Sequence, residues 1–150
     1  MYKRILVPVD GSETANRGLA EALKLATSLR AALKLVHVVD NSALALNPEA
    51  GIAAAPLAQD FSEDGKRVLE EAKALATREG ASVEAALHEN FTGRVADLIV
   101  QEAKSWGADL IVMGTHGRRG IRHVVLGSDA EAVVRAATVP VLLLRAPGRK

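Results

Sequence analysis

Two glycine-containing segments carry the residues most able to do chemistry. One is Pro8-Val9-Asp10-Gly11-Ser12, and the other runs from Gly114 to Gly120. Glycine lets the main chain turn sharply and come close to a ligand. Gly127-Ser128 stands where a helix is expected to begin, and the unpaired N–H groups of a helix start attract anions. These features predict a phosphate site, with Asp10 placed to accept hydrogen bonds from ribose hydroxyls or to help hold a divalent metal.

Each feature also has a purely structural interpretation. Gly114 and Gly117 could only shape the turn after a strand, and Ser128 could only cap a helix. His116 and Arg118 could add positive charge to a phosphate site, but they are also typical of solvent-exposed loops. The prediction therefore depends on the combination and not on any single residue.

The surrounding elements alternate between apolar runs and helical periodicity. Strands are expected at 5–7, 33–39, 83–87, 110–113 and 139–144, and helices are expected to begin near 12, 60, 95 and 128. Leu110 to Met113 is continuously apolar, which is typical of a central parallel strand. The alternation predicts an α/β fold: one domain, residues 1–150, with an open parallel five-stranded sheet and helices on both faces. Ligands of such sheets bind beyond the carboxyl ends of the strands, where both glycine segments fall.

One connection is unusually long. The stretch from Asn41 to Gln59 contains Pro48, Gly51 and Pro56, and it predicts an irregular segment before a helix that begins near Asp60. Such a segment is either a mobile lid that becomes ordered when ligand binds or an insertion without a role. The helix is expected to turn Phe61 inward.

Composition excludes several classes of protein. The net charge is +1, with 19 basic and 18 acidic side chains, and only 3% of residues are aromatic, so a nucleic-acid-binding protein is not expected. The absence of cysteine excludes disulfides and cysteine-based metal sites. No apolar run is long enough for a membrane span, and Pro8 and Asp10 interrupt the apolar start, which predicts a cytoplasmic protein.

The glycine spacing is itself a pattern: Gly114, two residues, Gly117, nine residues, then Gly127-Ser128. At average glycine usage it arises by chance in roughly one of two hundred chains of this length. It resembles the phosphate-loop signature of the ATP-binding branch of the universal stress protein family. The segments 5–12, 35–38 and 139–144 resemble the opening, second and closing strands of that family, in order. The resemblance implies the strand order 3-2-1-4-5.

The resemblance also implies a site for ATP bound together with Mg²⁺. Pro8, Val9 and Asp10 would flank adenine and ribose, Val38 would contact adenine, and His37 would either neighbour adenine or pack within its strand. The other implied contacts are Met113 and Gly114 at the ribose, and Gly117, Gly127, Ser128, Asp129 and Ala130 at the phosphates. Asp129 departs from the apolar residue of many relatives, and it would repel phosphate, hold the metal or complement the helix dipole.

The function implied is a regulatory, ATP-binding stress-response protein. It would act as a homodimer through the final strand, Val139–Leu144, because an apolar edge left uncovered is prone to aggregation. Two alternatives remain open: a slow ATPase or phosphotransferase that uses Ser128 or His116, and a dimerisation module that binds no nucleotide.

Overall fold

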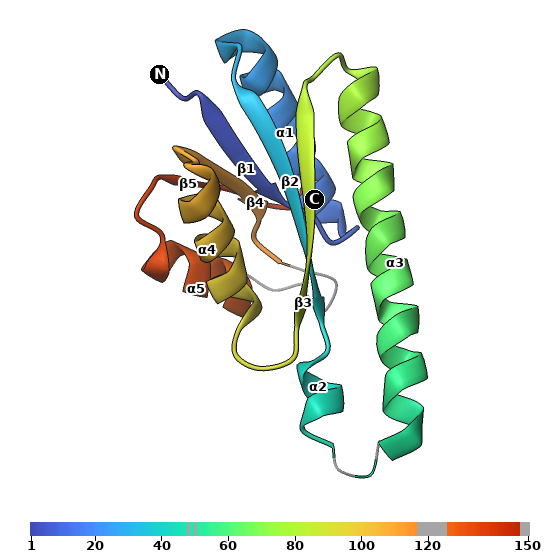
Figure 1. The fold of residues 1–150 in the computed structure, drawn as a ribbon. Coiled ribbons are helices and arrows are strands. Elements are labelled where there is room, and N and C mark those ends of the chain that lie inside the picture. Colours follow the sequence, from blue (N-terminus) through green and yellow to red (C-terminus); the bar gives the residue numbers. More distant parts are fainter. Residues whose placement is uncertain (48, 50, 117–125, 148–150) are drawn as a thin grey trace.

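A parallel sheet forms the centre of the molecule (Figure 1). The structure is a computed structural model that describes residues 1–47, 49, 51–116 and 126–147. In these residues the strands are β1 (Arg4–Pro8), β2 (Ala32–Asp40), β3 (Val83–Asn90), β4 (Leu110–Gly114) and β5 (Val141–Leu144). They lie in the order β3-β2-β1-β4-β5, and all neighbouring pairs are parallel. The fold class and the strand order predicted from the sequence are confirmed.

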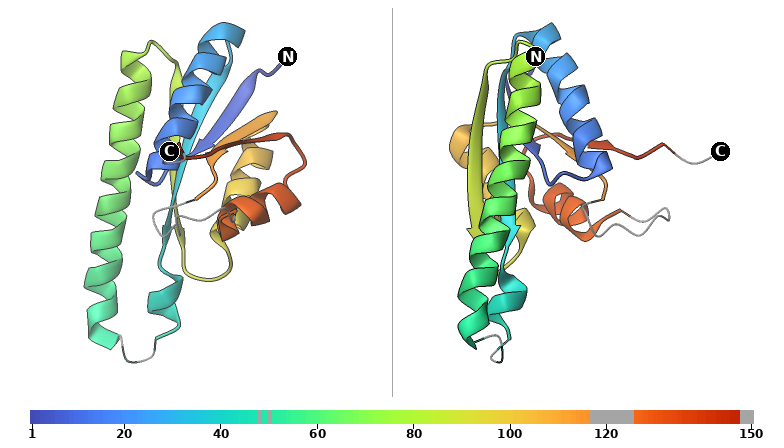
Figure 2. Two further views of the ribbon diagram at one scale, coloured as in Figure 1. Left: turned by 180° about the vertical axis from the view of Figure 1, so that it is seen from behind. Right: turned by 90° about the vertical axis from the view of Figure 1, so that its right-hand side faces the viewer.

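Helices cover both faces of this sheet (Figure 2). The apolar cluster on one face joins the strands to α1 (Glu13–Leu29) and α3 (Gly51–Arg78). The cluster on the other face joins them to α4 (Val95–Trp106) and α5 (Ser128–Ala136). Successive strand residues alternate between the faces, so Ile5 and Val7 belong to the first cluster and Leu6 to the second. All three side chains are fully buried, as a central parallel strand requires.

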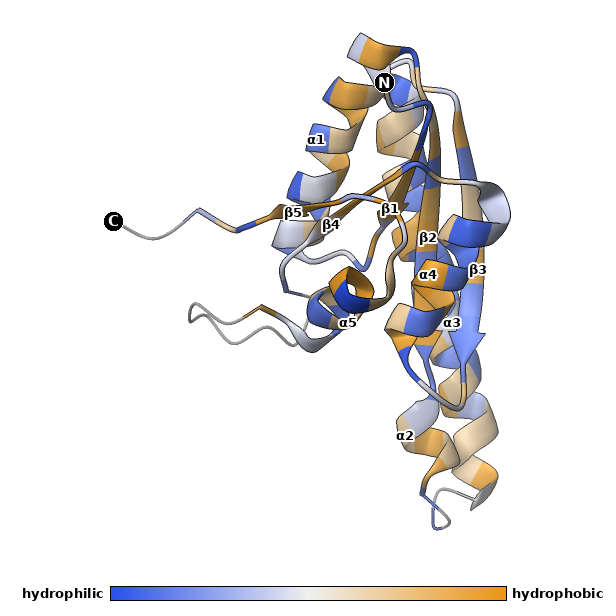
Figure 3. Ribbon diagram, turned by 90° about the vertical axis from the view of Figure 1, so that its left-hand side faces the viewer, coloured by the Kyte–Doolittle hydropathy of each residue, from blue (hydrophilic) through white to orange (hydrophobic). Residues whose placement is uncertain are grey.

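The edge strands differ from the central ones. In Figure 3, β1, β2 and β4 are largely apolar, whereas β3 carries many hydrophilic residues. β3 and β5 each have a neighbour on one side only, in agreement with the alternating pattern of residues 83–87. β5 is shorter than expected, since it begins at Val141 and not at Val139. Among the described residues, none of the helices combines the length and the apolar character needed to cross a lipid bilayer.

The prediction of an irregular segment from Asn41 to Gln59 is wrong. Ser42–Ala45 forms the short helix α2, and α3 already begins at Gly51, well before Asp60. The segment is rich in alanine, which has the highest helix propensity, and Pro56 lies early in the helix. Phe61 is 44% exposed instead of pointing inward, because the buried residues of α3 start only at Gly65. The first half of α3 extends, together with α2, beyond the end of the sheet (Figure 1).

Candidate functional site

The carboxyl ends of β1, β2 and β4 lie at one edge of the sheet. After β1 the chain enters α1 on one face, and after β4 it leads to α5 on the opposite face. The strand order therefore reverses between β1 and β4, which is the position at which open α/β sheets bind their ligands. Both glycine-containing segments identified in the sequence begin at this point.

Asp10 lies just beyond the end of β1. Its Oδ1 accepts a hydrogen bond from the Ser12 amide at 2.9 Å, which holds the turn into α1. The alternation of the strand places Pro8 and Asp10 on the face covered by α4 and α5. Val38, in the neighbouring strand, packs against the apolar cluster of the same face. Three predicted site residues are thus brought to the same face near the carboxyl end of the sheet.

Val9 and His37 face the other way. The Val9 side chain belongs to the cluster beneath α1 and α3, and the His37 Nδ1–H donates to the Val9 carbonyl oxygen at 2.6 Å. The His37 ring lies against α3, where a Cβ on Gly65 would come within 2.9 Å of the ring carbon Cδ2. His37 is therefore a packed strand residue, which is the second of the two roles expected for it. Val9 could contact a ligand only through its main-chain atoms.

The end of β4 is fitted closely to α1. Met113 is buried on the face of α4 and α5. A Cβ on Gly114 would lie 2.5 Å from Thr14 Oγ1 and 2.6 Å from the Thr14 carbonyl carbon, so no larger residue fits without a shift of the main chain. The carbonyl oxygen of His116 accepts hydrogen bonds from the hydroxyls of Ser12 and Thr14. These contacts attach the segment that follows β4 to the start of α1.

The start of α5 supplies main-chain donors. Gly127 is the N-cap residue, and its N–H donates to the Thr115 carbonyl oxygen at 2.8 Å, so this amide maintains the turn. Helix geometry leaves the amides of Ser128, Asp129 and Ala130 without an intrahelical acceptor, and these can meet a phosphate. Gly117 and Arg118, both predicted contacts, lie outside the described residues.

Sequence reasoning missed Asp40, the last residue of β2. Its Oδ1 accepts hydrogen bonds from the Ser42 amide at 3.1 Å and from Asn90 Nδ2 at 3.0 Å, and Asn90 is only 3% exposed. The available signal was positional, since Asp40 ends the strand beside the one that Asp10 follows. Partial burial raises the pKa of Asp129, and the negative charges of Asp40 and Asp10 raise it further. Three carboxylates from separate elements therefore interact at this edge.

These carboxylates do not form a metal centre. Within the described part of the chain, no three His, Asp or Glu side chains are arranged to hold a metal ion. The geometry instead offers an apolar wall at Val38 and Met113, main-chain donors at the start of α5 and acceptors at Asp10. This combination suits a nucleotide, whose base, ribose and phosphate need those three surroundings in turn.

Known proteins share this architecture and sequence. The model of the universal stress protein family matches residues 1–145. The chain belongs to the universal stress protein family. Universal stress protein MJ0531 of Methanocaldococcus jannaschii is 33% identical over 150 residues, covering 100% of this chain and 86% of that protein. The solved structure of MJ0577 from the same organism is 28% identical and has a TM-score of 0.87. The match covers 99% of this chain and 99% of that chain.

Two further family structures contain nucleotides. A universal stress protein in complex with cAMP is 27% identical with a TM-score of 0.69, covering 95% of this chain and 97% of its own. The universal stress protein of Archaeoglobus fulgidus in complex with dAMP is 28% identical with a TM-score of 0.67, covering 95% and 98%. Adenine nucleotides are thus ligands of structurally similar members of the family.

Proposed function

We propose that this universal stress protein binds an adenine nucleotide at the carboxyl edge of its sheet. The observation that carries the proposal is the meeting of Asp10, Val38, Met113 and the first turn of α5 at the point where the strand order reverses. The complexes of similar family members with cAMP and dAMP support the same ligand class. Adenine would lie against Val38, the ribose beside Asp10 and Gly114, and the phosphates at the amides of Ser128 to Ala130.

ATP with Mg²⁺ is the proposed form of the nucleotide. The described residues hold no preformed metal centre, so Mg²⁺ would arrive on the phosphate oxygens of the nucleotide. By the family resemblance, His116 and Arg118, the latter outside the described residues, would contact the phosphates. The protein would respond to nucleotide state as a regulator in the cytoplasm during stress, as a single nucleotide-binding domain.

A homodimer through β5 is the proposed assembly. β5 is an edge strand, and its Leu142 is 37% exposed on one face while Val134 of α5 is 45% exposed on the other. An apolar hollow of about 170 Å³ lies nearby, lined in part by Ala137 and Val139. Pairing of two β5 strands across a twofold axis would cover this apolar edge. Light scattering should give twice the protomer mass, and a monomer would exclude the dimer.

The nucleotide proposal is tested by analysis of the purified protein. Mass spectrometry of the protein denatured after purification without added nucleotide should detect ATP, ADP or AMP. Calorimetric titration with ATP then measures binding, and phosphate release over hours separates a binding protein from a slow ATPase. Binding without turnover is the expected result, and release of phosphate would favour the slow ATPase instead.

Gly127→Val is the variant that tests the phosphate end. A Cβ on Gly127 would lie 2.8 Å from the Thr115 carbonyl oxygen, so the branched side chain must displace the turn that precedes α5. ATP binding should be lost while thermal unfolding stays cooperative. Glu131→Gln, an exposed change in the same helix, is the matched control and should bind as the parent does. Gly117→Val is expected to act similarly, on the family resemblance alone. Unchanged binding by both glycine variants would exclude this phosphate site.

A further inference from the structure

The apolar stripe of α3 continues beyond the part of the helix that packs on the sheet. The buried residues of α3 begin at Gly65, and Val68 is only 7% exposed. Phe61 precedes these two residues at helical spacing and continues the same stripe, yet it is 44% exposed. Leu57, one turn earlier, is 41% exposed. We call residues 51–64 the arm, because this part of α3 extends beyond the sheet (Figure 1). The fold of one chain thus leaves an apolar face of the arm open, and such faces are typical of interaction surfaces.

The charges around the arm restrict what can cover it. Glu49 is the one charged residue between positions 41 and 59, and the next charges along the chain are acidic, at Asp60, Glu63 and Asp64. Helices that lie on lipid surfaces combine an apolar face with lysine and arginine. The arm contains neither of these residues, so an anionic membrane would repel it. The surface that fits the arm is therefore an apolar protein surface that places no negative charge opposite Asp60.

The sizes of the exposed side chains match a second copy of the same arm. Ala53, Leu57 and Phe61 recur every four residues and are all exposed, so they form one row along the helix, about 40° apart. When two such rows meet antiparallel with Leu57 at the centre, Phe61 of each copy lies opposite Ala53 of the other. Large side chains then meet small ones, as close helix packing requires, and Asp60 faces the uncharged start of the other arm. Parallel pairing would instead bring Phe61 against Phe61 and Asp60 against Asp60.

We propose that the arms of two chains pair antiparallel through Ala53, Leu57 and Phe61. The row spans about 12 Å, so the contact is far smaller than the roughly 800 Å² per partner of a standard interface. Pairing through the arms alone is therefore weak and reversible. α3 packs against β2 and β3, whereas β5 lies at the opposite edge of the sheet. Arm pairing is thus separate from the proposed β5 pairing and joins different β5 dimers, each of which supplies two arms.

Single introduced cysteines test this pairing, because the chain has none of its own. Leu57→Cys places two thiols at the centre of the antiparallel contact. Ile52→Cys is the matched control, since Ile52 is 98% exposed but lies about 140° around the helix from Leu57. With a short bismaleimide cross-linker, Leu57→Cys should form covalent dimers about tenfold faster than Ile52→Cys, because pairing raises the effective concentration of its thiols. Random collision would favour the more exposed position 52.

A second substitution identifies the contact. Phe61→Glu, added to Leu57→Cys, places a charge in the apolar row and should remove the faster cross-linking, while thermal unfolding shows that the variant is folded. Cross-linking at position 52 as fast as at position 57, or a rate at position 57 that Phe61→Glu leaves unchanged, would overturn the pairing of the arms. These measurements use no nucleotide, so the proposed nucleotide binding stands or fails independently of them.

Discussion

The charged side chains at the two ends of the sheet have different surroundings. At the amino end, the Asp109 carboxylate accepts hydrogen bonds from the amides of Lys3 at 2.8 Å and Arg4 at 3.0 Å. The Arg4 guanidinium lies 5.0 Å from the centre of the Trp106 ring and donates to the Trp106 carbonyl oxygen at 2.5 Å. At the carboxyl end, partial burial raises the pKa of Asp129, and the negative charges of Asp40 and Asp10 raise it further.

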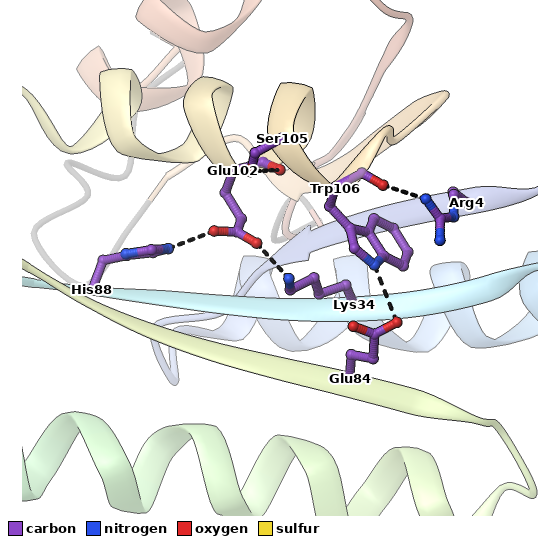
Figure 4. A network of polar contacts seen from close by, with 7 residues as sticks. All are labelled: Arg4, Lys34, Glu84, His88, Glu102, Ser105 and Trp106. Atoms are coloured by element: carbon purple, nitrogen blue, oxygen red, sulfur yellow. Dashed lines mark hydrogen bonds and ion pairs between the residues drawn. The ribbon is translucent and has the colours of Figure 1, made fainter.

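This difference indicates that the amino end contributes to the stability of the fold and the carboxyl end to ligand binding. Between the two ends, Glu102 of α4 forms an ion pair with Lys34 at 2.5 Å and accepts a hydrogen bond from His88 Nε2 at 2.7 Å (Figure 4). Trp106 Nε1 donates to Glu84, so α4 is attached to both β2 and β3 by opposite charges and polar contacts. Groups that only hold a fold are paired in this way, whereas like charges kept together weaken it and are typical of functional sites. Substitutions at the two ends should therefore have separable effects.

The largest effect is expected for Trp106→Ala. The side chain is 8% exposed and loses its packing against Arg4, its contact with Lys34 and its hydrogen bond to Glu84. The free energy of unfolding should fall by about 3–5 kcal/mol. Nucleotide affinity, measured at a temperature where the variant is still folded, should stay within about twofold, because Trp106 is remote from the carboxyl edge. A large loss of affinity in folded protein would contradict the separation.

Gly114→Ala is expected to affect both properties. The new Cβ meets main-chain atoms of α1, with 2.6 Å to the Thr14 carbonyl carbon and 2.7 Å to the Ala15 nitrogen. Overpacking of this kind costs about 1–3 kcal/mol, and the shift of β4 against α1 should also weaken nucleotide binding. Gly18→Ala is the matched control from the other side of the same contact, where the nearest atom is 3.4 Å away. Chemical denaturation and calorimetric titration should show Gly18→Ala to be neutral or stabilising, since alanine favours helix.

Glu102→Gln should destabilise the fold in a pH-dependent manner. Burial alone would raise the pKa of Glu102, but the hydrogen bonds and charges of Lys34 and His88 lower it below its ordinary value. A carboxyl with a lowered folded-state pKa stabilises the fold above its unfolded-state pKa, and the contribution disappears as the pH falls through the folded-state value. The variant should lose about 1–3 kcal/mol at neutral pH. In denaturation at decreasing pH, the difference from the parent should shrink only below the ordinary pKa of glutamate, and a constant difference would exclude this role.

The smallest effects on stability and affinity are expected for substitutions of two aspartates, one at each end of the sheet. Asp109→Ala should lower the free energy of unfolding by about 1–2 kcal/mol through its lost hydrogen bonds and leave nucleotide binding unchanged. Asp10→Ala should have the inverse profile, with affinity reduced by about 0.5–1.5 kcal/mol for each lost ribose hydrogen bond. Its effect on the free energy of unfolding should be the smaller of the two, although it also removes the hydrogen bond from the Ser12 amide. If both variants behaved alike in both assays, the division between the two ends would be wrong.

Much of the fold was predictable because its signals are local. The continuous apolar run of β4 and the alternation of strands with helices were sufficient for the fold class. The error at 41–59 has the same origin: Gly51 and Pro56 predict an irregular segment, although the alanines around them favour helix. Phe61 was misplaced because periodicity identifies a helix face but not how far the sheet beneath it extends.

The site was predictable only in part. Asp10, Gly114 and the start of α5 stand directly after expected strands or at an expected helix start, so their meeting follows from the topology. Asp40 accepts a hydrogen bond from Asn90, which lies 50 positions away in the sequence, and no local sequence pattern predicts such a contact. The Lys34–Glu102 pair was missed for the same reason, since parallel strands bring together segments that are remote in the chain.

The most direct test of the account is to map the nucleotide on the protein. An isotope-labelled sample titrated with AMP and followed by amide chemical shifts reports every affected residue. The account predicts saturable changes at Asp10, Val38, Gly114 and Ser128, and no change at Asp109 or Trp106 at the amino end. Saturable changes confined to the amino end, or no saturable change at all, would contradict the assignment of the carboxyl edge as the nucleotide site.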